Sequence, residues 1–97
     1  MRYEIILAPE AAKDLKLLNA HLRTEIRDAV ERHLRHEPTK ISKSRIKRLR
    51  GVSRPQYRLR VGEIRVFYDV SKDAVEVLAI VAKSQSEDWL REAGESI

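Results

Sequence analysis

QYRLRVGEIRVFYDV, residues 56–70, is the stretch of sequence that decides the fold. Apolar and polar residues alternate on both sides of Gly62-Glu63, which is the pattern of two half-buried β-strands. A Gly-X pair between two such runs is typical of a two-residue type II′ turn. The sequence therefore predicts a β-hairpin that closes at Gly62.

The predicted hairpin has one apolar face and one basic face, because successive side chains of a strand point to opposite sides. The apolar face carries Tyr57, Leu59, Val61, Ile64, Val66 and Tyr68. The other face carries Arg58, Arg60, Arg65 and Phe67, and we call it the arginine face. Its two directly opposed arginines, Arg60 and Arg65, repel each other at a cost of about 0.2–1 kcal/mol. Three cations beside an aromatic ring predict a site for a phosphate-bearing ligand; the alternative is a solvated strand face with splayed arginines.

The length and composition indicate one small domain, residues 1–97, with room for a single core. With 42% hydrophobic and 36% charged residues, the chain resembles a soluble and highly charged globular protein. It contains no cysteine, so neither disulfides nor thiolate metal sites are expected. No signal peptide or spanning segment is recognised, so a cytoplasmic protein without a membrane partner is expected.

Positive charge is concentrated in the middle of the chain. Residues 40–65 contain ten Lys/Arg and one acid, a net charge of +9, whereas the rest of the chain carries −4 of the total of +5. A basic surface on a mildly acidic body points to nucleic acid or to an acidic protein segment as the partner.

The remaining elements follow from periodicity and capping signals. Residues 2–7 predict a first strand, and residues 9–19 predict a helix with Pro9 in its first turn. A break at residues 19–21 precedes a second helix that ends before Pro38, so the two helices form an antiparallel hairpin laid on a sheet. Residues 74–82 are apolar on both sides and predict a central strand. Ser84 to Glu87 reads as a capping box that opens a short C-terminal helix, with Trp89 as its anchor to the body.

The basic connection between the second helix and the hairpin is expected to form a rim beside the arginine face. A short helical turn is predicted over residues 42–49 and a bend at Gly51; the alternative is a flexible basic loop. Steering of a polyanion needs only charge and proximity. The predicted RNA-binding residues are Lys43, Arg45, Lys47, Arg48, Arg50, Arg54 and Phe67. His33 and His36 lie three residues apart without a third ligand nearby, so neither a metal site nor a cofactor is expected.

The order of elements, together with three segments, closely resembles the RelE/ParE toxin superfamily and its RelE branch in particular. The segments are KRLRG at residues 47–51, YRLR at residues 57–60 and IRVFYDV at residues 64–70. The resemblance covers essentially the whole chain. It implies an α+β fold of order β-α-α-β-β-β-α, with a small, mainly antiparallel sheet of about four strands. The helical hairpin is expected on one face of that sheet, followed by a short C-terminal helix.

The resemblance also implies a function and a site. Members are bacterial or archaeal toxins that a cognate antitoxin, here expected to be acidic, holds inactive. RelE-type members cleave mRNA in the ribosomal A site without a metal, which makes this chain an expected endoribonuclease (mRNA interferase). Arg58 and Arg60 match the family's basic pair, Arg65 matches its phosphate-stabilising arginine, and Lys83 supplies a charge after the last strand.

One part of the family pattern is missing from this sequence. Trp89 or Leu90 falls where RelE-like toxins often have a Tyr or His for proton transfer. Three interpretations stay open: a ribosome-dependent mRNA endonuclease of reduced or modified efficiency, a ParE-like toxin that inhibits DNA gyrase through protein contacts, and an inactive or differently targeted relative.

Overall fold

The structure, a computed structural model, describes residues 1–96 and has an α+β fold. Its elements are β1 (Glu4–Leu7), α1 (Pro9–Lys16), α2 (Ala20–Leu34), β2 (Ile46–Arg48), β3 (Val52–Arg54), β4 (Tyr57–Val61), β5 (Ile64–Val70), β6 (Ala74–Ala82), the 3₁₀ turn η1 (Lys83–Gln85), α3 (Ser86–Ala93) and β7 (Glu95–Ser96). No helix within this range is both long and apolar enough to cross a membrane.

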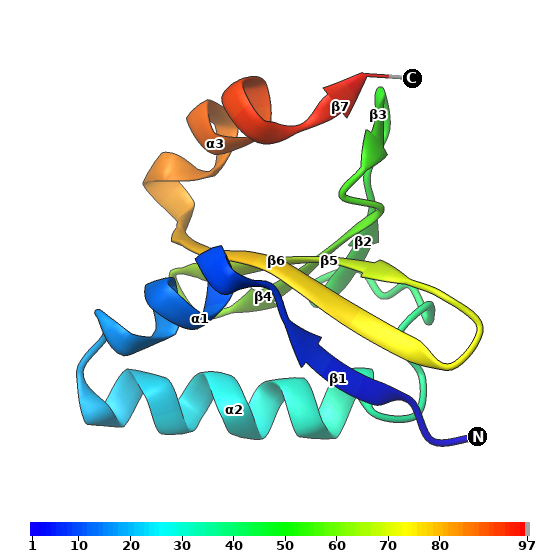
Figure 1. Ribbon diagram of the computed structural model, residues 1–97, viewed down its shortest axis with the longest axis horizontal. Coiled ribbons are helices and arrows are strands. Elements are labelled where there is room, and N and C mark those ends of the chain that lie inside the picture. Colours follow the sequence, from blue (N-terminus) through cyan, green and yellow to red (C-terminus); the bar gives the residue numbers. More distant parts are fainter. Residues whose placement is uncertain (97) are drawn as a thin grey trace.

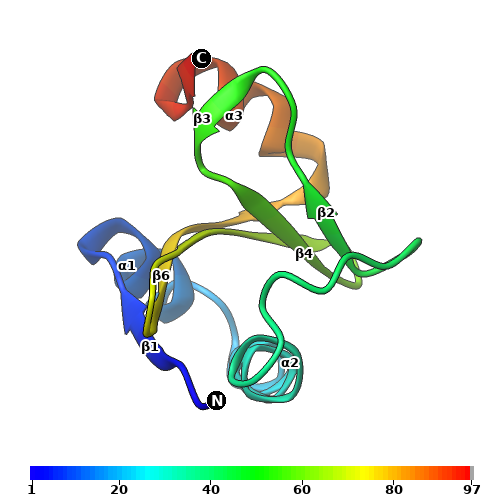
Figure 2. The same ribbon diagram turned by 90° about the vertical axis from the view of Figure 1, so that its right-hand side faces the viewer.

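A five-stranded sheet in the order β1-β6-β5-β4-β2 forms the centre of the molecule. Strand β1 runs parallel to β6, and the other three pairs are antiparallel, which confirms the mainly antiparallel sheet. Helices α1 and α2 lie on one side of this sheet, whereas α3 lies on the other side together with the small β3–β7 pair (Figure 1). The view turned by 90° shows the same separation, with α2 and α3 at opposite ends (Figure 2).

The hairpin has the predicted register. Arg60 pairs with Arg65 and Leu59 pairs with Val66 across β4 and β5. Gly62 has a φ of +58°, whereas the φ of Glu63 is not positive. A type II′ turn at Gly62-Glu63 requires this combination. The apolar face of the hairpin packs into the core, where Leu59, Val66 and Tyr68 are fully buried.

Helix α2 covers this apolar face with a stripe of buried residues, Ile26, Val30 and Leu34. Each such side chain stabilises the fold by about 1.5–3 kcal/mol when it leaves water. The helix begins where the Asn19 side chain accepts a hydrogen bond from the backbone N–H of Leu22, at 2.9 Å. Because Asn19 caps α2, α1 ends earlier than predicted, at Lys16.

Three local predictions are wrong. The main sheet has five strands rather than about four, since residues 46–48 of the basic connection form β2 and not a helical turn. The apolar side chain of Ile46 pairs opposite Leu59 and is buried, and this contact outweighs the local preference. Ser84 does not cap the C-terminal helix, because it lies within η1 and α3 begins only at Ser86. The Ser86 hydroxyl donates to the Lys83 carbonyl at 2.8 Å.

Candidate phosphate-binding site

Arg65 is the buried centre of the arginine face. Its residue is only 6% exposed, and its guanidinium donates to the backbone carbonyls of Gly62 and Ile64, at 2.9 and 3.0 Å. No carboxylate lies within 4.0 Å of it among residues 1–96. Burying a charge without a counter-charge is costly. The guanidinium of Arg65 therefore has no counter-charge at ion-pair distance among the described residues, and a phosphate would pair with it through charge-assisted hydrogen bonds.

Arg58, on the neighbouring strand β4, is also incompletely paired. Its Nε atom is buried and has no hydrogen-bond partner within the described part of the chain. Burial lowers the pKa of its guanidinium, and the charges of Arg65 and Arg60 lower it further. An anion bound between these side chains would supply a counter-charge, which would offset both the burial of the Arg58 charge and its repulsion from Arg65 and Arg60.

Arg58 and Arg65 line an open pocket of about 530 Å³ on this face of the sheet. Lys83 lines the same pocket, and its backbone N–H donates to the Glu63 carbonyl at 2.8 Å, which joins the end of β6 to the hairpin turn. Arg60 lies outside the pocket and lines a smaller hollow beside it with Arg45. The structure thus brings together three of the four predicted catalytic residues and places the fourth next to them.

The wall of this pocket includes groups that the sequence analysis did not select. They are Glu63, Ser84, Ser86, Glu87 and Asp88. Two acids in the first turn of the last helix, four and five residues after Lys83, were the available signal. Within residues 1–96, no group of three or more His, Cys, Asp and Glu side chains is arranged to hold a metal ion.

Helix α3 is fixed over the sheet by an aromatic pair. The rings of Phe67 and Trp89 stack with centroids 4.9 Å apart, and the Trp89 indole donates to the carboxylate of Glu10 at 3.0 Å. The predicted anchoring role of Trp89 is therefore confirmed. Phe67 is only 1% exposed, so the prediction that it contacts RNA on an open face is wrong: the ring supports α3 instead.

The basic connection places its cations on different sides of the sheet. Lys47 pairs opposite Arg58, and the backbone carbonyl of Arg45 accepts from the N–H of Arg60 at 2.8 Å, so both border the arginine face. Arg48 turns away, lies over the Tyr57 ring at 5.2 Å and donates to the Gln56 carbonyl. The other two predicted RNA-binding cations, Lys43 and Arg50, are exposed.

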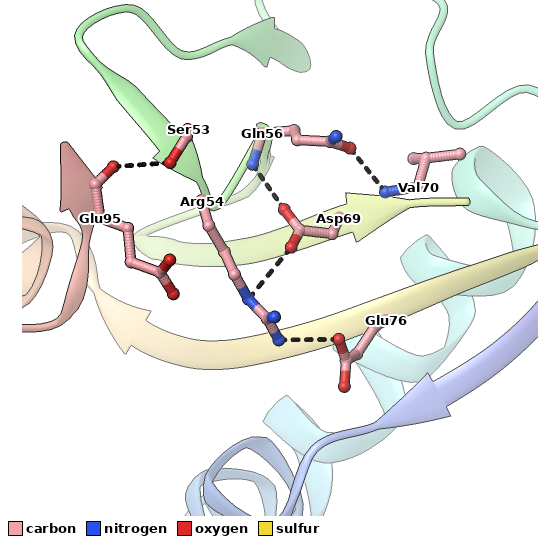
Figure 3. Close-up of polar contacts among 7 residues, drawn as sticks. All are labelled: Ser53, Arg54, Gln56, Asp69, Val70, Glu76 and Glu95. Carbon is pink, nitrogen blue, oxygen red and sulfur yellow. Dashed lines mark hydrogen bonds and ion pairs between the residues drawn. The ribbon is translucent and has the colours of Figure 1, made fainter. Parts of the chain in front are cut away.

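Arg54, one of the predicted RNA-binding cations, has two carboxylate partners. Its guanidinium lies 3.2 Å from Asp69 and 2.9 Å from Glu76, and Asp69 also accepts from the Gln56 N–H at 2.8 Å (Figure 3). Asp69 and Glu76 are direct neighbours across β5 and β6. The charge of Arg54 is therefore paired within the protein itself, where it reduces the repulsion between two neighbouring carboxylates.

Replacing Arg54 with glutamine is expected to lower the free energy of unfolding by about 1 kcal/mol, because the two carboxylates would then face each other without a counter-charge. Thermal or urea unfolding measures this loss. Affinity for a single-stranded oligonucleotide should stay unchanged. Arg50→Gln is the matched control and should show the reverse: weaker binding and unchanged stability. Weaker binding by Arg54→Gln alone would contradict the structural role.

Comparison with known proteins identifies the family. The family model described as the ParE toxin of type II toxin–antitoxin systems, parDE, matches residues 5–89. The chain belongs to this toxin family. The ParE toxin family is part of the RelE/ParE superfamily, so the superfamily that the sequence predicted is confirmed.

Solved structures of RelE toxins share the fold of this ParE-family chain. The RelB–RelE antitoxin–toxin complex from Methanococcus jannaschii matches with a TM-score of 0.66 and 25% identity, over 87% of this chain and 96% of that chain. The free Escherichia coli toxin RelE, a mutant with two arginines replaced by alanine, matches with a TM-score of 0.69 and 22% identity, over 92% of both chains. The RelBE2 complex from Mycobacterium tuberculosis matches with a TM-score of 0.69 and 20% identity, over 84% of this chain and 99% of that chain. No curated protein sequence matches.

Proposed function

We propose that this toxin is an endoribonuclease that cleaves mRNA on the ribosome, and so inhibits translation in the cytoplasm, without a metal ion. The observation that carries the proposal is the buried Arg65, which has no carboxylate within 4.0 Å among residues 1–96 and lines an open pocket. A buried charge without a partner costs stability, and such charges cluster at functional sites, so Arg65 is a candidate for binding an anion. The phosphodiester of RNA is the anion that the resemblance to RelE toxins implies.

Cleavage of RNA through its own 2′-hydroxyl makes three demands. The hydroxyl loses its proton as its oxygen bonds to the adjacent phosphorus, negative charge grows on the phosphoryl oxygens, and the departing 5′-oxygen gains a proton. In the proposed site, Arg58 and Arg65 hold the phosphate and stabilise the growing charge, while Arg60 orients the strand beside them. The ammonium group of Lys83 donates to the leaving oxygen.

The remaining demand, a base for the 2′-hydroxyl, is proposed to fall on a carboxylate of the pocket wall. Glu63 and Glu87 line the pocket, and neither has an ion-pair partner within 4.0 Å in the described residues. The carboxylate of Asp88 is less suited, because Arg91 donates to it at 2.9 Å. Glutamate in the hairpin turn or in α3 would thus take the place of the family's Tyr or His.

Tyr68 takes no part in this chemistry, and Tyr68→Phe is expected to leave the cleavage rate unchanged. The Tyr68 hydroxyl is buried in the core, donates to the Pro38 carbonyl at 2.7 Å, and has its pKa raised by burial. Removing the hydroxyl leaves that carbonyl unpaired, so the free energy of unfolding should fall by about 1–3 kcal/mol. Urea unfolding and a cleavage assay below the unfolding transition separate the two effects. A stable but inactive Tyr68→Phe protein would contradict the assignment.

The proposed partner is an acidic antitoxin whose chain covers the arginine face. The M. jannaschii relative is described as an antitoxin–toxin complex, and residues 40–65 here carry a net charge of +9 that an acidic segment would neutralise. Folding of a disordered acidic chain on such a surface is physically reasonable.

A second candidate function is inhibition of DNA gyrase through protein contacts. It is favoured by the match to the ParE toxin model and by Trp89, which occupies the place of the Tyr or His as an anchor for α3. In that case the arginine face would be a docking surface for protein.

Expression without antitoxin distinguishes the two candidates. The nuclease proposal predicts growth arrest and new mRNA 5′ ends inside translated codons, detected by primer extension on a reporter. Gyrase inhibition predicts intact mRNA and a block of supercoiling by the purified toxin. Normal growth with neither signal would reject both and indicate an inactive relative.

A further inference from the structure

A second group of cations lies where α2 meets the basic connection. It surrounds a pocket of about 330 Å³. The side chains that could serve an anion there are Arg32, His33, Lys40, Ser42, Ser44 and Arg45. Of these residues, only Arg45 was predicted from the sequence to bind RNA.

The local structure holds the wall of this pocket in place. The Ser42 hydroxyl oxygen accepts the backbone N–H groups of Arg45 and Ile46, at 3.0 and 3.1 Å. The Ser42 N–H in turn donates to the Ile46 carbonyl at 3.0 Å. Because Ile46 is buried in the core, the turn before β2 is anchored to the body of the protein.

The charge in this pocket is mainly positive. The one acid in its wall, Glu37, lies 3.6 Å from Lys40, whereas Arg32 and Arg45 have no ion-pair partner within 4.0 Å in the described part of the chain. The potential acts on His33, whose pKa is lowered first by burial and then by the charges of Arg45 and Arg32. Glu25 and Asp28 of α2 line the adjoining hollow beside His33 and limit the basic surface on that side.

A short basic bridge joins this pocket to the arginine face. Ser44, Arg45, Arg60 and Gly62 line a hollow of about 210 Å³ between them. Arg60 pairs opposite Arg65 across the hairpin, so cations follow one another from the buried arginine to Arg45 and on to Arg32. A single strand of nucleic acid carries one phosphate per nucleotide and matches such a row better than an isolated anion does.

We propose that the pocket around Arg32 and Arg45 is a second phosphate subsite, which binds the backbone of the same RNA strand whose scissile phosphate lies at Arg65. This inference rests on the proposed function, because it extends the RNA path from that site. The subsite adds affinity without reading bases, since its contacts are to phosphate.

Binding of 2′-O-methyl oligonucleotides, which cannot be cleaved through the 2′-oxygen, tests the subsite by fluorescence anisotropy at several salt concentrations. Arg32→Gln is expected to weaken a nonanucleotide about 3–10-fold at low salt and to reduce the slope of log K against log[salt] by about 0.7. A trinucleotide, which fills only the site at Arg65, should bind both proteins equally. Arg27→Gln is the matched control, since Arg27 is exposed on the same helix and lies outside the basic pocket.

The imidazole of His33 gives a second readout that needs no substitution. In NMR titrations, the nonanucleotide should raise the pKa of His33 because a phosphate offsets the repulsion from Arg32 and Arg45, and the trinucleotide should not. An Arg32→Gln protein that binds the nonanucleotide as Arg27→Gln does would overturn the subsite. If Arg65→Gln still abolishes binding in that case, the proposed site survives; if the wild-type protein binds neither oligonucleotide, the proposed function itself fails.

Discussion

Replacing Arg65 with glutamine is expected to reduce mRNA cleavage about 10²–10³-fold and to abolish growth arrest. A preorganised charge aimed at the reacting phosphate contributes about this much to the rate, since it stabilises the charge that grows in the transition state. Arg65 donates to two backbone carbonyls and is almost fully buried, so its guanidinium is held in place before RNA binds. Primer extension on a translated reporter, with wild type and variant at equal expression, measures the loss.

The Arg65→Gln variant is expected to remain folded. Glutamine keeps part of the side chain and removes the repulsion from the directly opposed Arg60, so the free energy of unfolding should change by about 1 kcal/mol or less. Arg27→Gln, which removes an equal charge from an exposed position of α2, should remain fully active. Full cleavage by a folded Arg65→Gln toxin would contradict the role proposed for Arg65. If the wild-type toxin leaves mRNA intact and inhibits gyrase, a loss of that inhibition in Arg65→Gln would support the alternative.

The hairpin could be predicted because its periodicity and its turn agree. Alternation from Tyr57 to Tyr68 allows one register only, in which a one-residue slip would turn Leu59 and Val66 out of the core. Since the arginines occupy the opposite positions, the same pattern also predicted which side of the sheet carries the charge. Local sequence was sufficient here.

Other features depend on contacts between distant segments, and local sequence did not reveal them. Strand β2 forms because Ile46 pairs opposite Leu59. Arg54 forms ion pairs with Asp69 and Glu76, which lie on two other strands. Phe67 alternates correctly toward the arginine face, yet Trp89, 22 residues later in the sequence, covers it. Each correction concerns a side chain whose partner comes from another element.

The position of α3 links the fold to the candidate chemistry. The stacked rings of Phe67 and Trp89 hold the helix over the sheet, and this brings Glu87 to the wall of the pocket that Arg58 and Arg65 line. Carboxylates among arginines weaken the attraction for RNA, so their presence in the pocket carries an electrostatic cost. A role in proton transfer would account for that cost.

The double variant Glu63→Gln/Glu87→Gln is therefore expected to bind RNA more tightly and to cleave it about 10²–10⁴-fold more slowly, the usual contribution of a general base. The two effects have opposite signs, which separates a catalytic role from an electrostatic one. If one carboxylate is the base, its single variant should show nearly the whole loss of rate, and the other single variant should only bind more tightly. Single-turnover cleavage by programmed ribosomes measures the rate, and anisotropy with a 2′-O-methyl oligonucleotide measures the affinity. Tighter binding with an unchanged or faster rate would contradict a carboxylate base and leave cleavage to the arginines and Lys83.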